Sequence, residues 1–65
     1  MSEFAKQIYA YRQGRKMTQA QLAAHLKVSK DTISNWECGT HQARGGLLIR
    51  ISEIMRETEE REASK

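Results

Sequence analysis

The side chains best suited to specific hydrogen bonding lie within residues 29–35 of this 65-residue chain. An Asn side chain can bond adenine through two hydrogen bonds, Lys can donate to guanine, and Asp can accept from the amino group of cytosine. If this run is helical, one face carries these groups while the apolar Ile33 and Trp36 face inward. The polar side chains on the outer face would be Lys30, Asp31, Ser34 and Asn35.

Two alternatives stay open for this face. It can be an ordinary solvated polar surface, which is the usual fate of such residues. Asp31 can instead serve as a negative charge at the helix N-terminus or orient Lys30, because phosphates repel a carboxylate.

The elements that position this run are two short helices joined by a tight turn. Thr18 with Gln21 three residues later predicts a capping box, followed by an inner face of Leu22, Ala23 and Leu26. Lys27 and Val28 form the predicted turn, in which we expect Lys27 to be left-handed. Ser29 caps the second helix, which runs to about Cys38 and ends at Gly39.

Two further helices complete the predicted all-α bundle. The first runs from about Glu3 to Gln13, capped by Ser2, with Gly14 as its stop signal and Phe4, Ile8 and Tyr11 on its inner face. After a loop over residues 40–46, the last helix begins near Gly45 and carries an apolar stripe to Met55. We expect it to continue into residues 56–62 and then to fray.

Residues 18–39 resemble the helix-turn-helix of the phage repressor and Cro family, the XRE type. The matching features are Thr18-Gln19, the small Ala23, the run from Ser29 to Glu37, and Gly39. The similarity extends over roughly residues 4–55. It implies a compact, lambda-repressor-like bundle of four short helices, and no fifth helix is expected because no large apolar residue follows Met55. Two departures are Lys27, where the family most often has Gly, and residues 43–46, which lack the family's Pro.

The resemblance implies roles for several residues. Residues 30, 31, 34 and 35 would contact bases, and Gln19 would brace a phosphate at its helix N-terminus. Arg12 and Glu37 would form a shielded ion pair between the helix over residues 3–13 and the helix that follows Ser29. The alternatives are a plain helix start for Gln19, a polar loop for residues 40–44, and two exposed charges that never meet. The phosphate candidates are Thr18, Gln19, Ser29, Thr40, His41, Gln42 and Arg44.

The family resemblance also implies a partner and a mode of action. The partner is a double-stranded DNA operator with two-fold symmetry, bound by a homodimer that acts as a transcriptional repressor or Cro-like switch. The protein would be bacterial or phage-encoded and cytoplasmic. Leu47, Ile49 and Ile54 are the candidate dimer residues. The alternative is an antitoxin or adaptor module whose main partner is another protein, recognised through the last helix and the acidic tail.

Composition is consistent with one small basic domain. Residues 1–56 contain nine basic and four acidic side chains, whereas residues 57–65 contain two basic and four acidic ones. The chain therefore divides into a helix-turn-helix domain over residues 1–56 and a charged tail over residues 57–65. The sequence has no long apolar run, so it predicts neither a membrane span nor a signal peptide.

Other chemistry finds little support in the sequence. His25 and the single Cys38 form no metal-ligand pattern, so we expect no metal and no cofactor. The sequence also shows no set of nucleophile, base and orienting group, so we expect no enzymatic activity. His25 is expected to be solvated and Trp36 to be a packing residue. A redox role for Cys38 stays open.

Overall fold

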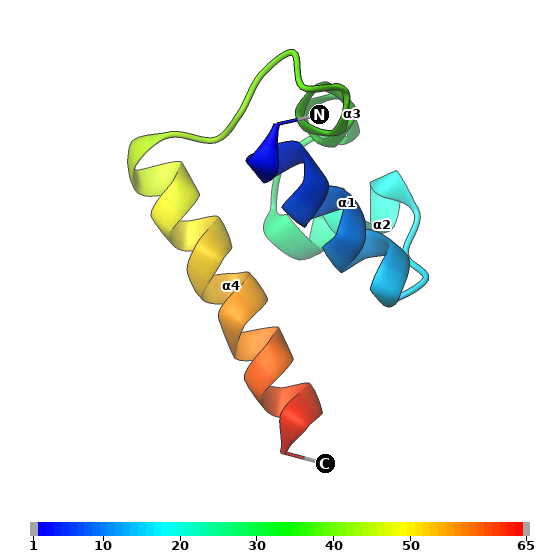
Figure 1. Ribbon diagram of the computed structural model, residues 1–65, viewed down its shortest axis with the longest axis vertical. Coiled ribbons are helices and arrows are strands. Elements are labelled where there is room, and N and C mark those ends of the chain that lie inside the picture. Colours follow the sequence, from blue (N-terminus) through cyan, green and yellow to red (C-terminus); the bar gives the residue numbers. More distant parts are fainter. Residues whose placement is uncertain (1, 65) are drawn as a thin grey trace.

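The computed structural model describes residues 2–64 and contains four helices (Figure 1). They are α1 (Glu3–Gly14), α2 (Gln19–Leu26), α3 (Lys30–Cys38) and α4 (Gly45–Ala63). The described residues contain no strand. The predicted all-α, four-helix fold is therefore confirmed.

Three helices begin at the predicted caps. The hydroxyl of Ser2 accepts from the Ala5 amide at 3.1 Å. Thr18 and Gln21 form the predicted capping box, with bonds of 2.8 and 3.0 Å between each side chain and the other's backbone amide. The Ser29 hydroxyl accepts from the Thr32 amide at 3.1 Å. These bonds satisfy amides that a helix start would otherwise leave without a partner.

The connection from α1 to α2 differs from the expectation. Gly14 is the last residue of α1, but the residue with a positive φ is Lys16, at 55°. The chain therefore turns two residues later than the glycine stop signal indicates. The amides of Arg15 and Lys16 extend the end of the helix by bonding the carbonyls of Arg12 and Gln13.

The turn between α2 and α3 follows the prediction. Lys27 has φ 60° and ψ 46°, a left-handed conformation, so that prediction is confirmed. The Val28 amide then donates to the Ala23 carbonyl at 2.9 Å and closes the turn. Ala23 is buried, as the close approach of the two helices requires.

The core gathers side chains from all four helices. Its largest fully buried members are Ile8, Leu22, Leu26, Ile33 and Ile51. Ala43 is also buried, although it lies in the connection between α3 and α4 and was not predicted as a core residue. The predicted inward placement of Ile33 and Trp36 is confirmed.

Helix α4 is the longest element and leads away from the connection that precedes it (Figure 1). Ile51 is its one fully buried residue, while Ile54 and Met55 pack against the core half-buried. Residues 57–63 stay helical, and Glu62 accepts from Arg15 Nη2 at 2.6 Å. The division of the chain at residue 56 stays a prediction.

The expectation that His25 is solvated is wrong. The imidazole ring is half-buried and stacks on the Tyr11 ring, with the two ring centroids 5.9 Å apart. Its Nε2 lies 2.8 Å from the Tyr11 hydroxyl. Thr58 of α4 lies at 3.4 Å from the same nitrogen. The sequence pattern missed this because α4 extends far enough to cover that side of α2.

Candidate nucleic-acid interface

The exposed face of α3 carries the predicted base-contacting residues. Lys30, Asp31 and Asn35 are exposed and Ser34 is half-buried. Ile33 is fully buried and Trp36 is only 3% exposed on the opposite face. Helix α3 therefore presents donors and acceptors outward and is held to the body by its apolar side.

The aromatic side chain of Trp36 fixes the inner face of α3 against α1. Its ring meets the Phe4 ring edge to face, with centroids 5.4 Å apart and an interplanar angle of 78°. That geometry is the favourable one for an aromatic pair. Trp36 is thus a packing residue in this structure, as expected.

Arg12 and Glu37 meet in a two-pronged ion pair. Arg12 Nε donates to Glu37 Oε2 at 2.7 Å, and Arg12 Nη2 donates to Glu37 Oε1 at 2.9 Å. Their side chains are only 14% and 8% exposed. The hydrogen bond to Glu37 raises the pKa of Arg12, while burial acts in the opposite direction. The third nitrogen, Nη1, donates to the Met17 carbonyl at 3.0 Å and so ties the α1–α2 connection to the pair.

Gln19, the predicted phosphate brace, joins the same network. Its Nε2 lies 3.4 Å from Glu37 Oε1, a long hydrogen bond. An amide nitrogen has two hydrogens, so one stays available for an anion in front of α2. Thr18 and Ser29 use their hydroxyls as helix caps, but both residues are exposed.

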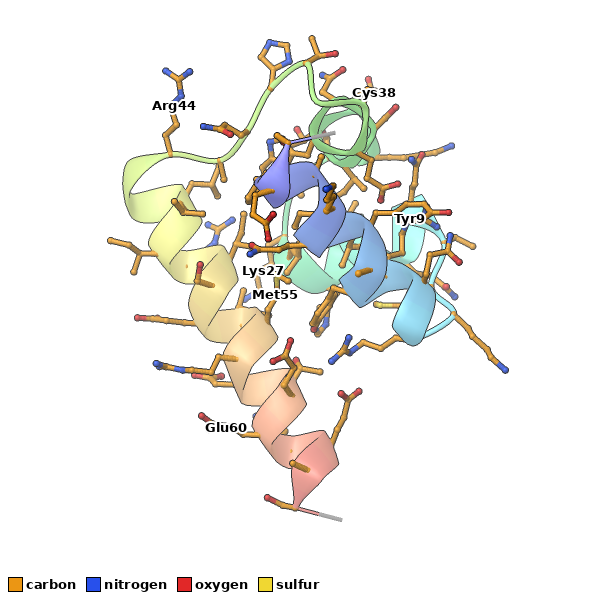
Figure 2. The ribbon with its side chains drawn as sticks, in the orientation of Figure 1. Tyr9, Lys27, Cys38, Arg44, Met55 and Glu60 are labelled. Carbon is orange, nitrogen blue, oxygen red and sulfur yellow. The ribbon has the colours of Figure 1, made fainter. Side chains whose placement is uncertain are left out.

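The connection after α3 forms an exposed polar rim. The amides of Thr40 and His41 both donate to the Asn35 carbonyl, at 3.0 and 3.4 Å, while buried Ala43 anchors the far end. Arg44 is exposed and stands at the N-cap of α4, whose first turn has no side-chain cap (Figure 2). The first amides of that turn therefore have no side-chain capping partner.

The acidic end of the chain lies far from this rim. In Figure 2, Glu60 and the end of α4 are at the opposite end of the molecule from Arg44 and Cys38. The uneven charge seen in the sequence is thus a separation in space.

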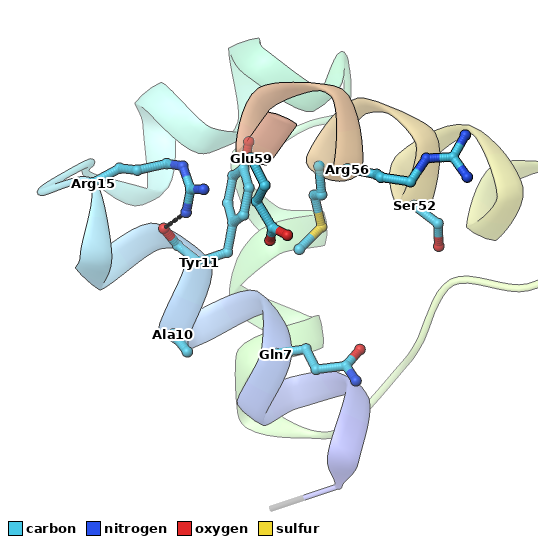
Figure 3. A pocket seen from close by; sticks show the side chains of 8 residues that line it. Gln7, Ala10, Tyr11, Arg15, Ser52, Arg56 and Glu59 are labelled. Carbon is cyan, nitrogen blue, oxygen red and sulfur yellow. Dashed lines mark hydrogen bonds between the residues drawn. The ribbon is translucent and has the colours of Figure 1, made fainter. Parts of the chain in front are cut away.

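A groove lies elsewhere on the molecule, between α1 and α4 (Figure 3). Its volume is about 520 Å³ and no residue of α3 lines it. The lining residues are Gln7, Ala10, Tyr11, Arg15, Ser52, Met55, Arg56 and Glu59. Among residues 2–64 no group of three or more His, Cys, Asp and Glu side chains could hold a metal ion, and none of the described helices has the length and apolar character to span a membrane.

Comparison with known families agrees with this geometry. A sequence-family model described as helix-turn-helix matches residues 8–61, which make up most of the chain. The chain belongs to this family, the XRE-type helix-turn-helix family of DNA-binding regulators. A search of curated proteins and a search of solved structures gave no significant match.

Two residues that support the site were missed at the level of sequence. Ala43 gives a faint signal, since it is the one apolar residue in an otherwise polar connection. Arg50 gives none. Its place in the sequence indicates only a surface charge on α4. In the structure its Nη2 donates to the carbonyls of Leu26 and Lys27 at the helix-turn-helix turn.

Proposed function

We propose that this protein is a sequence-specific regulator that inserts α3 into the major groove of double-stranded DNA. The observation that supports this most is the division of α3 into two faces. Lys30, Asp31 and Asn35 are exposed, whereas Ile33 and Trp36 behind them are buried. A helix so held can bring side chains to base edges without unfolding any part of the domain.

Phosphate contacts would flank the recognition helix on two sides. Gln19 and Thr18 stand at the start of α2, and Ser29 stands at the start of α3, where helix N-termini favour anions. Beyond the other end of α3, the exposed Thr40, His41, Gln42 and Arg44 would contact a second stretch of backbone. These contacts would set the register of α3 in the groove.

A homodimer on a two-fold symmetric operator completes the proposal. Leu47 is 36% exposed and Ile49 is 61% exposed on the first turns of α4, where a second copy could cover them. Ile54, in contrast, packs half-buried against its own core and has less surface to offer. So small an apolar surface favours a weak dimer that assembles on DNA.

Binding-site selection tests this proposal. The protein would be mixed with a pool of random-sequence duplexes, and bound duplexes would be amplified and sequenced over several rounds. We expect enrichment of one sequence with two-fold symmetry, whose half-sites are spaced by about one helical turn, about 34 Å. No enrichment, or selective capture of a protein partner with no DNA preference, would contradict it.

A further inference from the structure

Arg50 joins α4 to the helix-turn-helix turn by two hydrogen bonds. One nitrogen, Nη2, donates to the Leu26 carbonyl at 3.2 Å and to the Lys27 carbonyl at 3.4 Å. Leu26 is the last residue of α2, and Lys27 is its left-handed cap. Carbonyls at this place have no partner in the next helical turn, and a positive charge there also complements the helix dipole.

The position of Arg50 along α4 gives this bond its importance. The next residue, Ile51, is buried in the core at 1% exposure. The candidate dimer residues Leu47 and Ile49 lie within one helical turn on the other side. Arg50 therefore stands between the part of α4 that is exposed for a partner and the turn that orients α3.

The connection between α2 and α3 is very short. Lys27 and Val28 form the whole turn, and Ser29 already caps α3. Lys27 has a side chain at φ 60°, so its backbone conformation is disfavoured for any residue but glycine and needs support from its surroundings. The Arg50 guanidinium supplies such support by holding the two carbonyls on either side of that conformation.

We infer that Arg50 is a positioning residue that sets the angle of α3 from α4, and so contributes to the choice of DNA sequence without touching DNA. The inference rests on the proposed function. It implies that a partner covering Leu47 and Ile49 would steady Arg50 and, through it, the recognition helix. The inference thus predicts that formation of the dimer on DNA and discrimination between sequences are coupled.

The test compares three variants. Arg50→Met removes the donor but keeps a long apolar stem, while Arg50→Lys keeps the positive charge and one donor nitrogen on a side chain one bond shorter. Arg56→Met is the matched control, because Arg56 is 71% exposed on the same helix and its one ion pair, at 3.9 Å, is with Glu60 of α4 itself. All affinities would be measured well below each variant's melting temperature.

The main measurement is the ratio of affinities for the selected duplex and for a random duplex. We expect Arg50→Met to lower this ratio by up to about tenfold, the limit in which the free energy of one charge-assisted hydrogen bond is fully lost on the selected duplex alone. Arg50→Lys should keep it within about threefold of the unmodified protein, and Arg56→Met should leave it unchanged. Hydrogen exchange at the Val28 amide, which closes the turn, should be faster in DNA-free Arg50→Met than in Arg56→Met.

Several outcomes would overturn the inference. Equal ratios for Arg50→Met and Arg56→Met would do so, as would unchanged exchange at Val28. Equal weakening of both duplexes with a shallower salt dependence would make Arg50 a phosphate contact instead. If Arg50→Met fails to fold, Arg50→Lys is judged on both measurements: loss of discrimination with unchanged Val28 exchange overturns the inference, and discrimination and Val28 protection that are kept together or lost together support it. Absence of any DNA binding by the unmodified protein would instead remove the proposed function, with Val28 exchange still deciding whether Arg50 orders the turn.

Discussion

The guanidinium of Arg12 on α1 faces the carboxylate of Glu37 in the last turn of α3 through two hydrogen bonds, at 2.7 and 2.9 Å. The Arg12 side chain is 14% exposed and the Glu37 side chain is 8% exposed, so water does not easily replace either partner. The pair therefore joins the first helix to the recognition helix, and loss of one partner strands the other charge.

We predict that Glu37→Gln lowers the free energy of unfolding by about 3–5 kcal/mol, because Arg12 keeps its charge in a shielded place. A 65-residue domain has little more than that to lose. Thermal or urea unfolding would measure it. The double change Arg12→Met with Glu37→Leu should recover much of the stability, although the Met17 carbonyl then lacks its Arg12 donor.

The matched control is the ion pair between Arg15 and Glu62. Glu62 is 49% exposed, so Glu62→Gln should change the free energy of unfolding by less than about 1 kcal/mol. Equal and small effects for Glu37→Gln and Glu62→Gln would mean that burial of the Arg12–Glu37 pair has been overestimated. Additive single changes in the double-mutant cycle would lead to the same conclusion.

Replacement of Lys27 by glycine should leave stability unchanged or raise it by up to about 1 kcal/mol, because glycine meets no Cβ clash in the left-handed region. Lys16→Gly should behave alike, since Lys16 also has a positive φ. Ala24→Gly, at an exposed position inside α2, should instead destabilise the protein by about 1 kcal/mol. A clear drop in melting temperature for Lys27→Gly would contradict the strain assigned to that turn.

Substitutions at Asn35 and Gln19 should separate base contact from phosphate contact. Asn35→Ala should cost about 1–3 kcal/mol on the selected duplex and relax preference at one base pair. Gln19→Ala should weaken binding to selected and random duplexes alike. Competition binding measures both, and unchanged discrimination in Asn35→Ala would show that the assigned register of α3 is wrong.

A charge at Ile49 tests the proposed dimer. Ile49 is 61% exposed, so Ile49→Glu should leave the melting temperature nearly unchanged. Binding to a full two-fold site should nonetheless weaken and lose cooperativity, whereas binding to a half-site should stay the same. Ala24→Glu, at an exposed apolar position on α2, serves as the control. Identical behaviour of the two variants on the full site would argue against a dimer through α4.

Most of the fold could be predicted from signals between neighbouring residues. Caps, turn residues and apolar spacing act over a few neighbours, which is why Ser2, Thr18, Ser29 and left-handed Lys27 could be predicted from the sequence. The burial of Ala43 could not, because it depends on where the connection from α3 to α4 runs. His25 was misjudged for the same reason, since its partner Thr58 is 33 residues away in the chain.

The candidate site divides in a similar way. The two faces of α3 follow from helical spacing, and the pairing of Arg12 with Glu37 was expected from the family resemblance. The bonds from Gln19 to Glu37 and from Arg50 to the turn depend on the directions of long side chains across different helices. No spacing rule within one helix encodes such contacts.

The most direct test of the central claim, specific recognition of double-stranded DNA by α3, is a salt series of dissociation constants for the selected duplex and a random one. We predict that the selected duplex binds at least about 10³-fold more tightly at physiological salt. Both affinities should fall steeply with salt, with a slope for the dimer equivalent to about five or more phosphates. Equal affinities for the two duplexes, with little dependence on salt, would contradict the account.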